Sequence, residues 1–295
     1  MPVHTDSGGS FRLGAPPLPG HLFVLGPDDS YVFQAIGSRV VFDGQPGGDR
    51  RYSHAYAALD LKPGTGSQEV NLVLRRGATV EGRVVGPDGQ PVRDAWIFSR
   101  LILDPSRKGA RDWTGAYHGR VSNGAFAIHG FAPDAEVPVY FLEPERKLGA
   151  VVNLSVKSAA GGPVTVRLEP CGSARAWLVD SDGKPVAKPE RKLSITMVVT
   201  PGPAFRTSPN DKAPSLLSAD EGGLTEVDPI NYATLAPDAL GRIALPVLIP
   251  GATYRFIDYT TYVRGQAGGE IRKEFTVTPG QKLNLGDILI AKPPN

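Results

Sequence analysis

Cysteine is almost absent from this chain of 295 residues, in which Cys171 is the single example. One cysteine excludes an intramolecular disulfide and any structural zinc site built from several thiolates. Long apolar runs are also missing, because no segment approaches the roughly 20 apolar residues of a membrane-spanning helix. The opening residues, MPVHTDSGGSFRLG, lack the basic and apolar regions of a signal peptide. We therefore expect no membrane insertion and no export signal in the sequence as it stands.

An excess of charge of one sign is lacking as well. The chain has 32 Lys and Arg against 30 Asp and Glu, which leaves a formal net charge of +2. No run of like charges is long enough to mark a nucleic-acid or membrane-surface patch. The composition therefore predicts no nucleic-acid partner, and it leaves the compartment of the protein open.

Helical patterns are the third absence. No window of about a dozen residues has apolar side chains spaced by three and four without an intervening Gly or Pro. Gly (35) and Pro (28) are abundant, while a hydrophobic content of 41% is sufficient for buried cores. Short strands with frequent turn signals are typical of β-sandwiches and barrels. The predicted fold class is therefore all-β, with tandem sandwich modules of the transthyretin-like or Ig-like kind.

An internal repeat is the strongest positive feature. Residues 70–92 (VNLVLRRGATVEGRVVGPDGQPV) align without a gap with residues 164–186 (VTVRLEPCGSARAWLVDSDGKPV), at an offset of 94. Both copies contain an Asp-Gly pair, which is typical of tight turns because Gly tolerates the positive φ that such turns need. The alternating residues before each pair predict a half-buried strand. Each unit is about the size of a seven-stranded sandwich.

A second block recurs in each unit. GAFAI at 124–128 is followed by Pro133, and GRIAL at 241–245 is followed by Pro250. A third copy, GSFRL at 9–13, precedes Pro19 and the apolar pattern HLFVLG. We therefore predict two full units and one partial unit, in which a turn at Gly9 leads into a strand containing Phe11. The predicted core consists of the apolar members of the alternating runs: Val80, Val84, Phe126, Ile128, Val139 and Leu168, then Leu178, Ile243, Leu245, Phe256, Phe275 and Val277.

The pattern GATVEGRVVGPDGQPVRDA, followed by NGAFAIHGFAP, VPVYFL and PVTVRLEP, resembles the carboxypeptidase-regulatory-like repeat found in long bacterial proteins of planctomycete type. The resemblance covers residues 77–170 well, residues 171–295 with an insertion at about 201–238, and only the second half of a module in residues 1–76. It implies transthyretin-like (prealbumin-like) β-sandwiches with accessory, structural or ligand-binding roles and no catalytic residues.

The first module begins in the middle of a repeat, because nothing before Gly9 supplies an opening strand or its Asp-Gly turn. Such a module would leave a sheet edge uncovered, which native proteins rarely do. We therefore expect the chain to be the C-terminal part of a longer protein, with a missing N-terminal domain as a partner.

Short motifs with catalytic or metal-binding associations have simpler interpretations. Ser7 lies in DSGG, a sequence known from serine proteases, but only five residues precede it and Gly9 already has a role as a turn. Asp180 and Asp182 begin like a calcium loop, although the distal acidic ligand is missing. We therefore predict no catalytic residues, no cofactor and no metal.

GRVVGPDGQPVRDAWIFSR at 82–100 also resembles the entry strands of intradiol dioxygenases, and this resemblance implies the same sandwich with an iron held by two Tyr and two His. Tyr117, His118, His129 and Tyr140 are the residues from which such a set would be drawn, but the sequence has no His-x-His pair. His129 follows Ile128 on a strand, and we interpret it as a solvent-facing histidine.

Three inserts concentrate the residue types that bind partners. Residues 41–56 contain Arg51 and Tyr52, together with His54 and Tyr56, and residues 201–238 are long and polar. The insert at 104–120 is predicted to be exposed, extra to the fold and the best recognition surface, through Arg107, Lys108, Arg111, Trp113, Tyr117 and Arg120.

These observations favour a non-catalytic structural or interaction array, for which a protein or a polysaccharide is the expected partner. A carbohydrate-binding accessory module of starch-binding-like architecture is the main alternative, and an intradiol-dioxygenase-like enzyme is the third. The junctions RRGATV and EPCGSA lead from strand to strand without a flexible linker, so we expect neighbouring modules to be held semi-rigidly.

Overall fold

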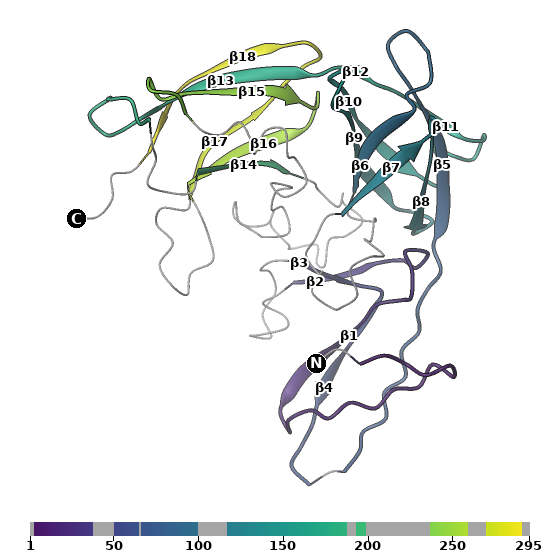
Figure 1. Ribbon diagram of the computed structural model, residues 1–295. Helices are drawn as coiled ribbons and strands as arrows, with labels where there is room; N and C mark the ends of the chain where they lie inside the picture. Colours follow the sequence, from purple (N-terminus) through teal and green to yellow (C-terminus); the bar gives the residue numbers. More distant parts are fainter. Residues whose placement is uncertain are drawn as a thin grey trace.

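The computed structural model describes residues 3–37, 50–64, 66–99, 117–187, 193–198, 237–258 and 270–290. Throughout these ranges the regular structure is β-strand, and no helix is present (Figure 1). The all-β fold class predicted from the sequence is confirmed. The described part of the chain accordingly contains no helix with the length and hydropathy of a membrane span.

The middle unit is a two-layered sandwich. One layer has the strand order β11-β5-β8 and the other has the order β7-β6-β9-β10-β12, and the two are joined where β7 meets β8. All neighbours are antiparallel except β11, which runs parallel to β5. The strands are β5 (Ala78–Val85), β6 (Asp94–Ser99), β7 (Tyr117–Ser122), β8 (Ala125–Phe131), β9 (Glu136–Glu143), β10 (Leu148–Ser155), β11 (Val164–Arg167) and β12 (Glu169–Pro170).

The last unit repeats this arrangement. Its layers have the orders β15-β13-β18 and β14-β16-β17, and its closing strand β18 again runs parallel to its opening strand β13. The strands are β13 (Gly172–Val179), β14 (Leu193–Val198), β15 (Arg242–Leu248), β16 (Thr253–Asp258), β17 (Glu270–Thr276) and β18 (Lys282–Leu289). The domain boundary predicted between residues 170 and 171 falls between β12 and β13.

The repeat seen in the sequence is a repeat of structure. The opening strands β5 and β13 differ by 94 residues at both ends, which is the offset of the sequence alignment. Each is followed by the predicted turn, in which Gly89 (φ 77°) and Gly183 (φ 74°) adopt the left-handed conformation. The same isolated bridge closes both turns, Val85 with Pro91 and Val179 with Pro185. Every predicted core residue is buried, with at most 8% of its surface exposed.

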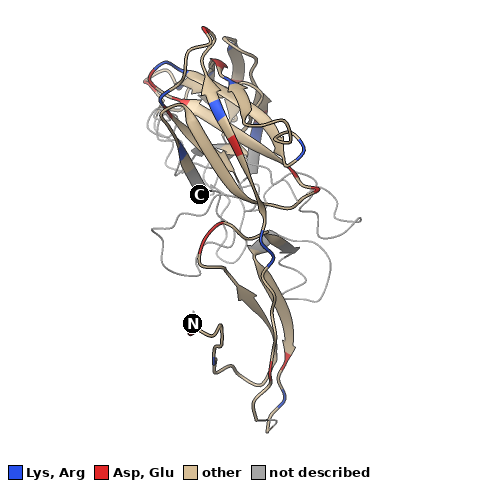
Figure 2. Ribbon diagram, turned by 90° about the vertical axis from the view of Figure 1, so that its right-hand side faces the viewer, with Lys and Arg blue, Asp and Glu red and all other residues tan. Residues whose placement is uncertain are grey.

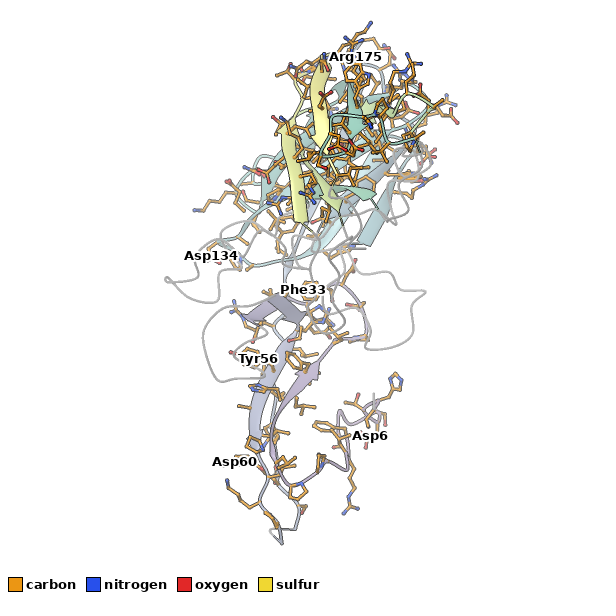
Figure 3. All side chains as sticks on the ribbon, turned by 90° about the vertical axis from the view of Figure 1, so that its left-hand side faces the viewer. Asp6, Phe33, Tyr56, Asp60, Asp134 and Arg175 are labelled. Carbon is orange, nitrogen blue, oxygen red and sulfur yellow. The ribbon has the colours of Figure 1, made fainter. Side chains whose placement is uncertain are left out.

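The N-terminal unit is less complete. Its strand β1 (Pro19–Val24) pairs antiparallel with β4 (Ala55–Asp60), and β2 (Gln34–Gly37) pairs with β3 (Arg50–Ser53). Its buried side chains, among them Phe33, lie at the end that adjoins the middle unit, whereas Asp60 lies at the far end (Figure 3). Gly77 N at the start of the middle unit donates to Ser30 O at 2.8 Å, and within the N-terminal unit Val32 N donates to Arg75 O at the same distance.

One prediction for this unit is wrong. The turn at Gly9 forms as expected, with φ 79°, but the strand predicted after it is absent. Phe11 and Leu13 are each 37% exposed instead of buried. The alternating sequence was the correct signal for a strand, but a strand also needs a neighbour that accepts and donates its backbone hydrogen bonds.

Candidate functional site

The predicted recognition insert lies mostly outside the described residues. This applies to Arg107, Lys108, Arg111 and Trp113, and to residues 201–236 of the long polar segment. The C-terminal end of the insert was predicted wrongly. Residues 117–120 form the first part of β7 and pair with β6, so that Tyr117 lies opposite Ser99. They belong to the sandwich because their backbone pairs with one edge of β6, whose other edge pairs with β9.

Arg120 is the member of the predicted surface whose side chain is described. Its guanidinium Nη2 lies 2.8 Å from Asp94 Oδ2 and its Cζ lies 5.8 Å from the centre of the Trp96 ring. The side chains of Arg120 and Asp94 are 52% and 61% exposed. The arginine therefore links two neighbouring strands on a solvated face, where such a pair contributes little to stability. Along the ribbon in Figure 2, the positions of Lys and Arg alternate with those of Asp and Glu.

The second predicted insert, at 41–56, is shorter than expected. Its last residues form β3 and the beginning of β4, so Arg51 and Tyr52 lie on a strand paired with β2. Their side chains fall outside the described part. Tyr56 lies on β4, is 39% exposed, and has its ring 6.5 Å from that of Phe23. Burial alternates along this strand, but AYAALD lacks a polar alternation that would have marked it in the sequence.

His54 has an environment that the sequence did not predict. It is fully buried, its Nδ1 accepts a hydrogen bond from Gly26 N at 2.6 Å, and its ring lies 4.4 Å from that of Phe33. Its Nε2 has no hydrogen-bond partner among the described residues. Burial lowers the pKa of His54 to about 4. His54 is therefore neutral at pH 7 and acts as part of the core next to the middle unit.

An apolar interface joins the middle and last units. Tyr140 and Leu142 on β9 point away from the core of their own unit and are 5% and 3% exposed, and Phe98 on β6 is fully buried in the same way. They form one cluster with residues of the last unit, including Leu248 and Ile249. Figure 1 shows β6, β9 and β10 on the side of the middle unit nearest the last unit. The layer β6-β9-β10 is thus buried on both faces.

The sequence contained a signal for this interface. VYFL at 139–142 is a continuous apolar run, and continuous runs are typical of strands covered on both faces. Close approach also explains Gly149, because a Cβ atom there would lie 3.2 Å from Cys171 Sγ and 3.3 Å from Ile249 Cγ1. The semi-rigid junction predicted at EPCGSA is thereby given a physical basis.

Two of the candidate iron ligands, His129 and Tyr140, have described side chains. His129 lies on the outer face of β8, where its Nδ1 is 2.8 Å from Thr79 Oγ1, whereas Tyr140 lies on the opposite side of the sandwich. These two candidate iron ligands therefore do not converge. Within the described ranges, no group of three His, Cys, Asp or Glu residues is arranged to hold a metal ion.

Three aspartates share one turn geometry. In each case a carboxylate oxygen accepts hydrogen bonds from backbone amides two and four residues later, at 2.9–3.0 Å. The amide of Arg242, aided by its guanidinium, lowers the pKa of Asp238 below its usual value. Turn formation thus accounts for Asp180, the first residue of the calcium-like sequence. The three residues are Asp6, Asp180 and Asp238.

Comparisons with known proteins give a likeness of fold type only. No family model matches the chain and no curated protein matches it. Among solved structures, the shaft pilin SpaA from Lactobacillus rhamnosus GG is 16% identical, covering 74% of this chain and 98% of its own, with a TM-score of 0.23. A streptococcal ancillary pilin is 13% identical, with coverages of 84% and 76% and a TM-score of 0.25. BcpA, the major pilin subunit of Bacillus cereus, is 8% identical, with coverages of 94% and 99% and a TM-score of 0.23.

Proposed function

We propose that this chain is a non-catalytic structural array in which the middle and last β-sandwich units form one rigid spacer. The apolar interface formed by Phe98, Tyr140 and Leu142 against Leu248 and Ile249 carries this proposal. Interfaces between domains that move freely are typically smaller and more polar. In an isolated sandwich the outer face of the layer β6-β9-β10 would be exposed to solvent. Here the last unit covers it.

The covalent junction between the units supports the same function. Cys171 N donates to Lys147 O at 2.7 Å, and Gly280 N donates to Pro170 O at 2.9 Å. The peptide that connects the two units is therefore held from both sides by backbone hydrogen bonds. A connection of this kind transmits orientation, which a flexible linker does not.

The recognition surface at 104–120 and the carbohydrate-binding alternative stay predictions, because Trp113 lies outside the described residues. Among the described tryptophans, Trp96 packs against the inter-unit cluster, and the ring of Trp177 has the guanidinium of Arg175 at 5.4 Å. Both tryptophan side chains are half-buried. A protein partner of an array built in this way would include a domain joined to its N-terminal side.

The proposal is tested by measuring the distance between the two units in solution. One spin label would be attached at Glu81→Cys on β5 of the middle unit and the other at Asn284→Cys on β18 of the last unit. Both sites are exposed, and Cys171→Ser removes the native thiol. A rigid spacer gives one narrow distance distribution in a pulsed electron paramagnetic resonance experiment. The control has a short Gly-Ser linker inserted after Pro170 and should give a broad distribution. Equally broad distributions in both proteins would refute the proposal.

A further inference from the structure

A loop of the N-terminal unit, residues 25–33 between β1 and β2, packs against the entry to the middle unit. The amide of Gly77 donates to Ser30 O at 2.8 Å. Tyr31 forms an isolated antiparallel bridge with Arg76, whose guanidinium Cζ lies 5.1 Å from the centre of the Tyr31 ring. Arg76 Nη1 also donates to Ser30 Oγ at 3.2 Å. We call the contact of this loop with the middle unit the joint.

The joint is closely packed against the interior of the middle unit. Leu25 and Phe33, at the two ends of the loop, pack with its core. On β8, a Cβ atom at Gly130 would lie 2.8 Å from the backbone oxygens of both Asp29 and Tyr31. A larger residue at Gly130 would therefore push the loop away. Packing this close gives the N-terminal unit a defined position on the middle unit.

His54 holds the loop from within the N-terminal unit. Its Nδ1 accepts a hydrogen bond from Gly26 N at 2.6 Å, and its ring lies 5.7 Å from that of Tyr31 and 4.4 Å from that of Phe33. A Cβ atom at Gly26 would lie 2.5 Å from the Tyr31 ring and 3.1 Å from His54 Nδ1. The backbone at Gly26 is thus clamped between these two side chains. A displacement of His54 is therefore passed to the part of the loop that forms the joint.

This site has no place for a second proton on the imidazole. Because Nδ1 accepts from Gly26 N, the ring proton of neutral His54 is on Nε2. A protonated imidazole has two N–H donors, and its Nδ1–H would then face the amide N–H of Gly26. The Nε2 atom has no hydrogen-bond partner among the described residues, and the side chain is fully buried. Protonation therefore requires that the contact with Gly26 breaks and that the ring reaches water.

We propose that the joint is an acid-sensitive switch: the loop 25–33 is docked on the middle unit while His54 is neutral and is released when His54 binds a proton. Docking fixes the orientation of the N-terminal unit, and release leaves the chain before β5 as its connection. The proposal concerns a different junction from that of the spacer formed by the middle and last units, and it does not depend on the spacer.

The acidic group that acts on His54 does not reverse this behaviour. The charge of Asp28 favours the protonated form and raises the pKa of His54, but burial, which lowers this pKa, is the larger effect. Hydrogen bonds from Ser30 lower the pKa of Asp28 itself below its usual value, so Asp28 stays ionised while His54 titrates. Other titratable or charged residues on the surrounding elements are Asp29 and Tyr31 in the loop, His21 on β1, Arg50 and Arg51 on β3, Arg75 and Arg76 before β5, and His129 on β8.

Amide hydrogen exchange at the joint tests the switch. The amides of Val32 and Gly77 donate to Arg75 O and Ser30 O, so their protection factors report docking of the loop. The pKa of His54 is about 4 when buried and 6.5 when released, and the docking equilibrium should therefore weaken on the order of 100-fold between pH 7 and pH 4. The protection factors of both amides should fall by this factor.

Two substitutions by glutamine are matched controls. His54→Gln keeps an acceptor for Gly26 N and does not titrate, so protection should persist at pH 4. His129→Gln removes the histidine next to Gly130 on the middle-unit side of the joint, and the fall in protection should remain. Nuclear magnetic resonance of the His54 ring in the native chain gives its protonation without any substitution. Its midpoint should coincide with the fall in protection.

Spin labels show whether the N-terminal unit is released as a body. Labels at Ala58→Cys on β4 and Glu81→Cys on β5, both exposed, are combined with Cys171→Ser. The distance distribution should be narrow at pH 7 and broad at pH 4. The pair at residues 81 and 284 should be the same at both pH values. A broad distribution for that pair at pH 7 would count against the spacer alone.

Three results would overturn the switch. The first is constant protection of Val32 and Gly77 from pH 7 to pH 4. The second is an equal fall in protection in His54→Gln, or its loss in His129→Gln, either of which assigns the effect to another group. The third is a midpoint of release that differs from the midpoint of His54 protonation.

Discussion

The complete units and the N-terminal unit share their local chemistry but differ in burial. The aspartate turn before the second block has the same hydrogen bonds at Asp6 and Asp238, yet Phe11 is 37% exposed and Ile243 is 1% exposed. The difference lies in the opening strand, which pairs with the second block only in the complete units. Turn and alternation therefore prepare a strand, and a neighbouring strand completes it.

The largest expected effect is a difference in stability loss between alanine substitutions at two aligned phenylalanines, Phe126 and Phe11. Phe126→Ala removes a side chain that is 6% exposed and in contact with the Phe141 ring, and it should cost about 3–5 kcal/mol of unfolding free energy. Phe11→Ala at the matching position should cost less than about 1 kcal/mol. Guanidinium denaturation followed by circular dichroism measures both. Equal losses would mean that Phe11 is buried in solution, and the comparison between the units would fail.

The next effect tests whether the two complete units act as one. Phe98→Ala should cost about 3–5 kcal/mol, and amide exchange should accelerate in both β9 and β16, because this side chain lies in the shared cluster. Ile97→Ala is the control, since Ile97 points into the core of the middle unit alone. If Phe98→Ala left the exchange of β16 unchanged, the interface would not couple the units.

Acid should loosen the N-terminal unit before the complete ones. The pKa of His54 is lowered from 6.5 to about 4, so between these pH values the unfolded chain binds a proton that the folded unit does not. Stability is therefore retained above pH 6.5 and lost as the pH falls towards 4, by on the order of 2–3 kcal/mol.

Amide exchange at β1 and β4 as a function of pH measures this loss. The variant His54→Gln keeps an acceptor for Gly26 N and does not titrate, so its exchange should lack the dependence between pH 6.5 and 4. The same dependence in both proteins would assign it to another group.

The smallest effect concerns the surface of the middle unit. Arg120→Ala should lower its stability by less than about 1 kcal/mol, because both members of the pair with Asp94 are more than half exposed. A thermal melt provides the measurement. A loss above about 2 kcal/mol would show that the arginine over Trp96 has a structural role at the edge of the inter-unit cluster.

The sequence predicted most of the interior of the complete units. The alternation around Val80 and Ile243 assigned the buried face of each strand, and the Asp-Gly pairs located the turns, because these features depend on residues close together in the chain. The assignment failed at residues 117–120, where a basic and aromatic composition suggested an insert. These residues form β7, which is defined by its pairing with β6.

The sequence by itself determined the repeat, the turns and the strand faces of the complete units. Only the tertiary structure decided what covers each face. Tyr140 and Leu142 lie on the face that alternation assigns to solvent, and the last unit buries them. His54, which the sequence placed in an insert with partner-binding residue types, is buried, with its ring next to Phe33 and its Nδ1 accepting from Gly26 N. Periodicity states which side chains point the same way, whereas burial depends on segments distant in the sequence that come to lie over them.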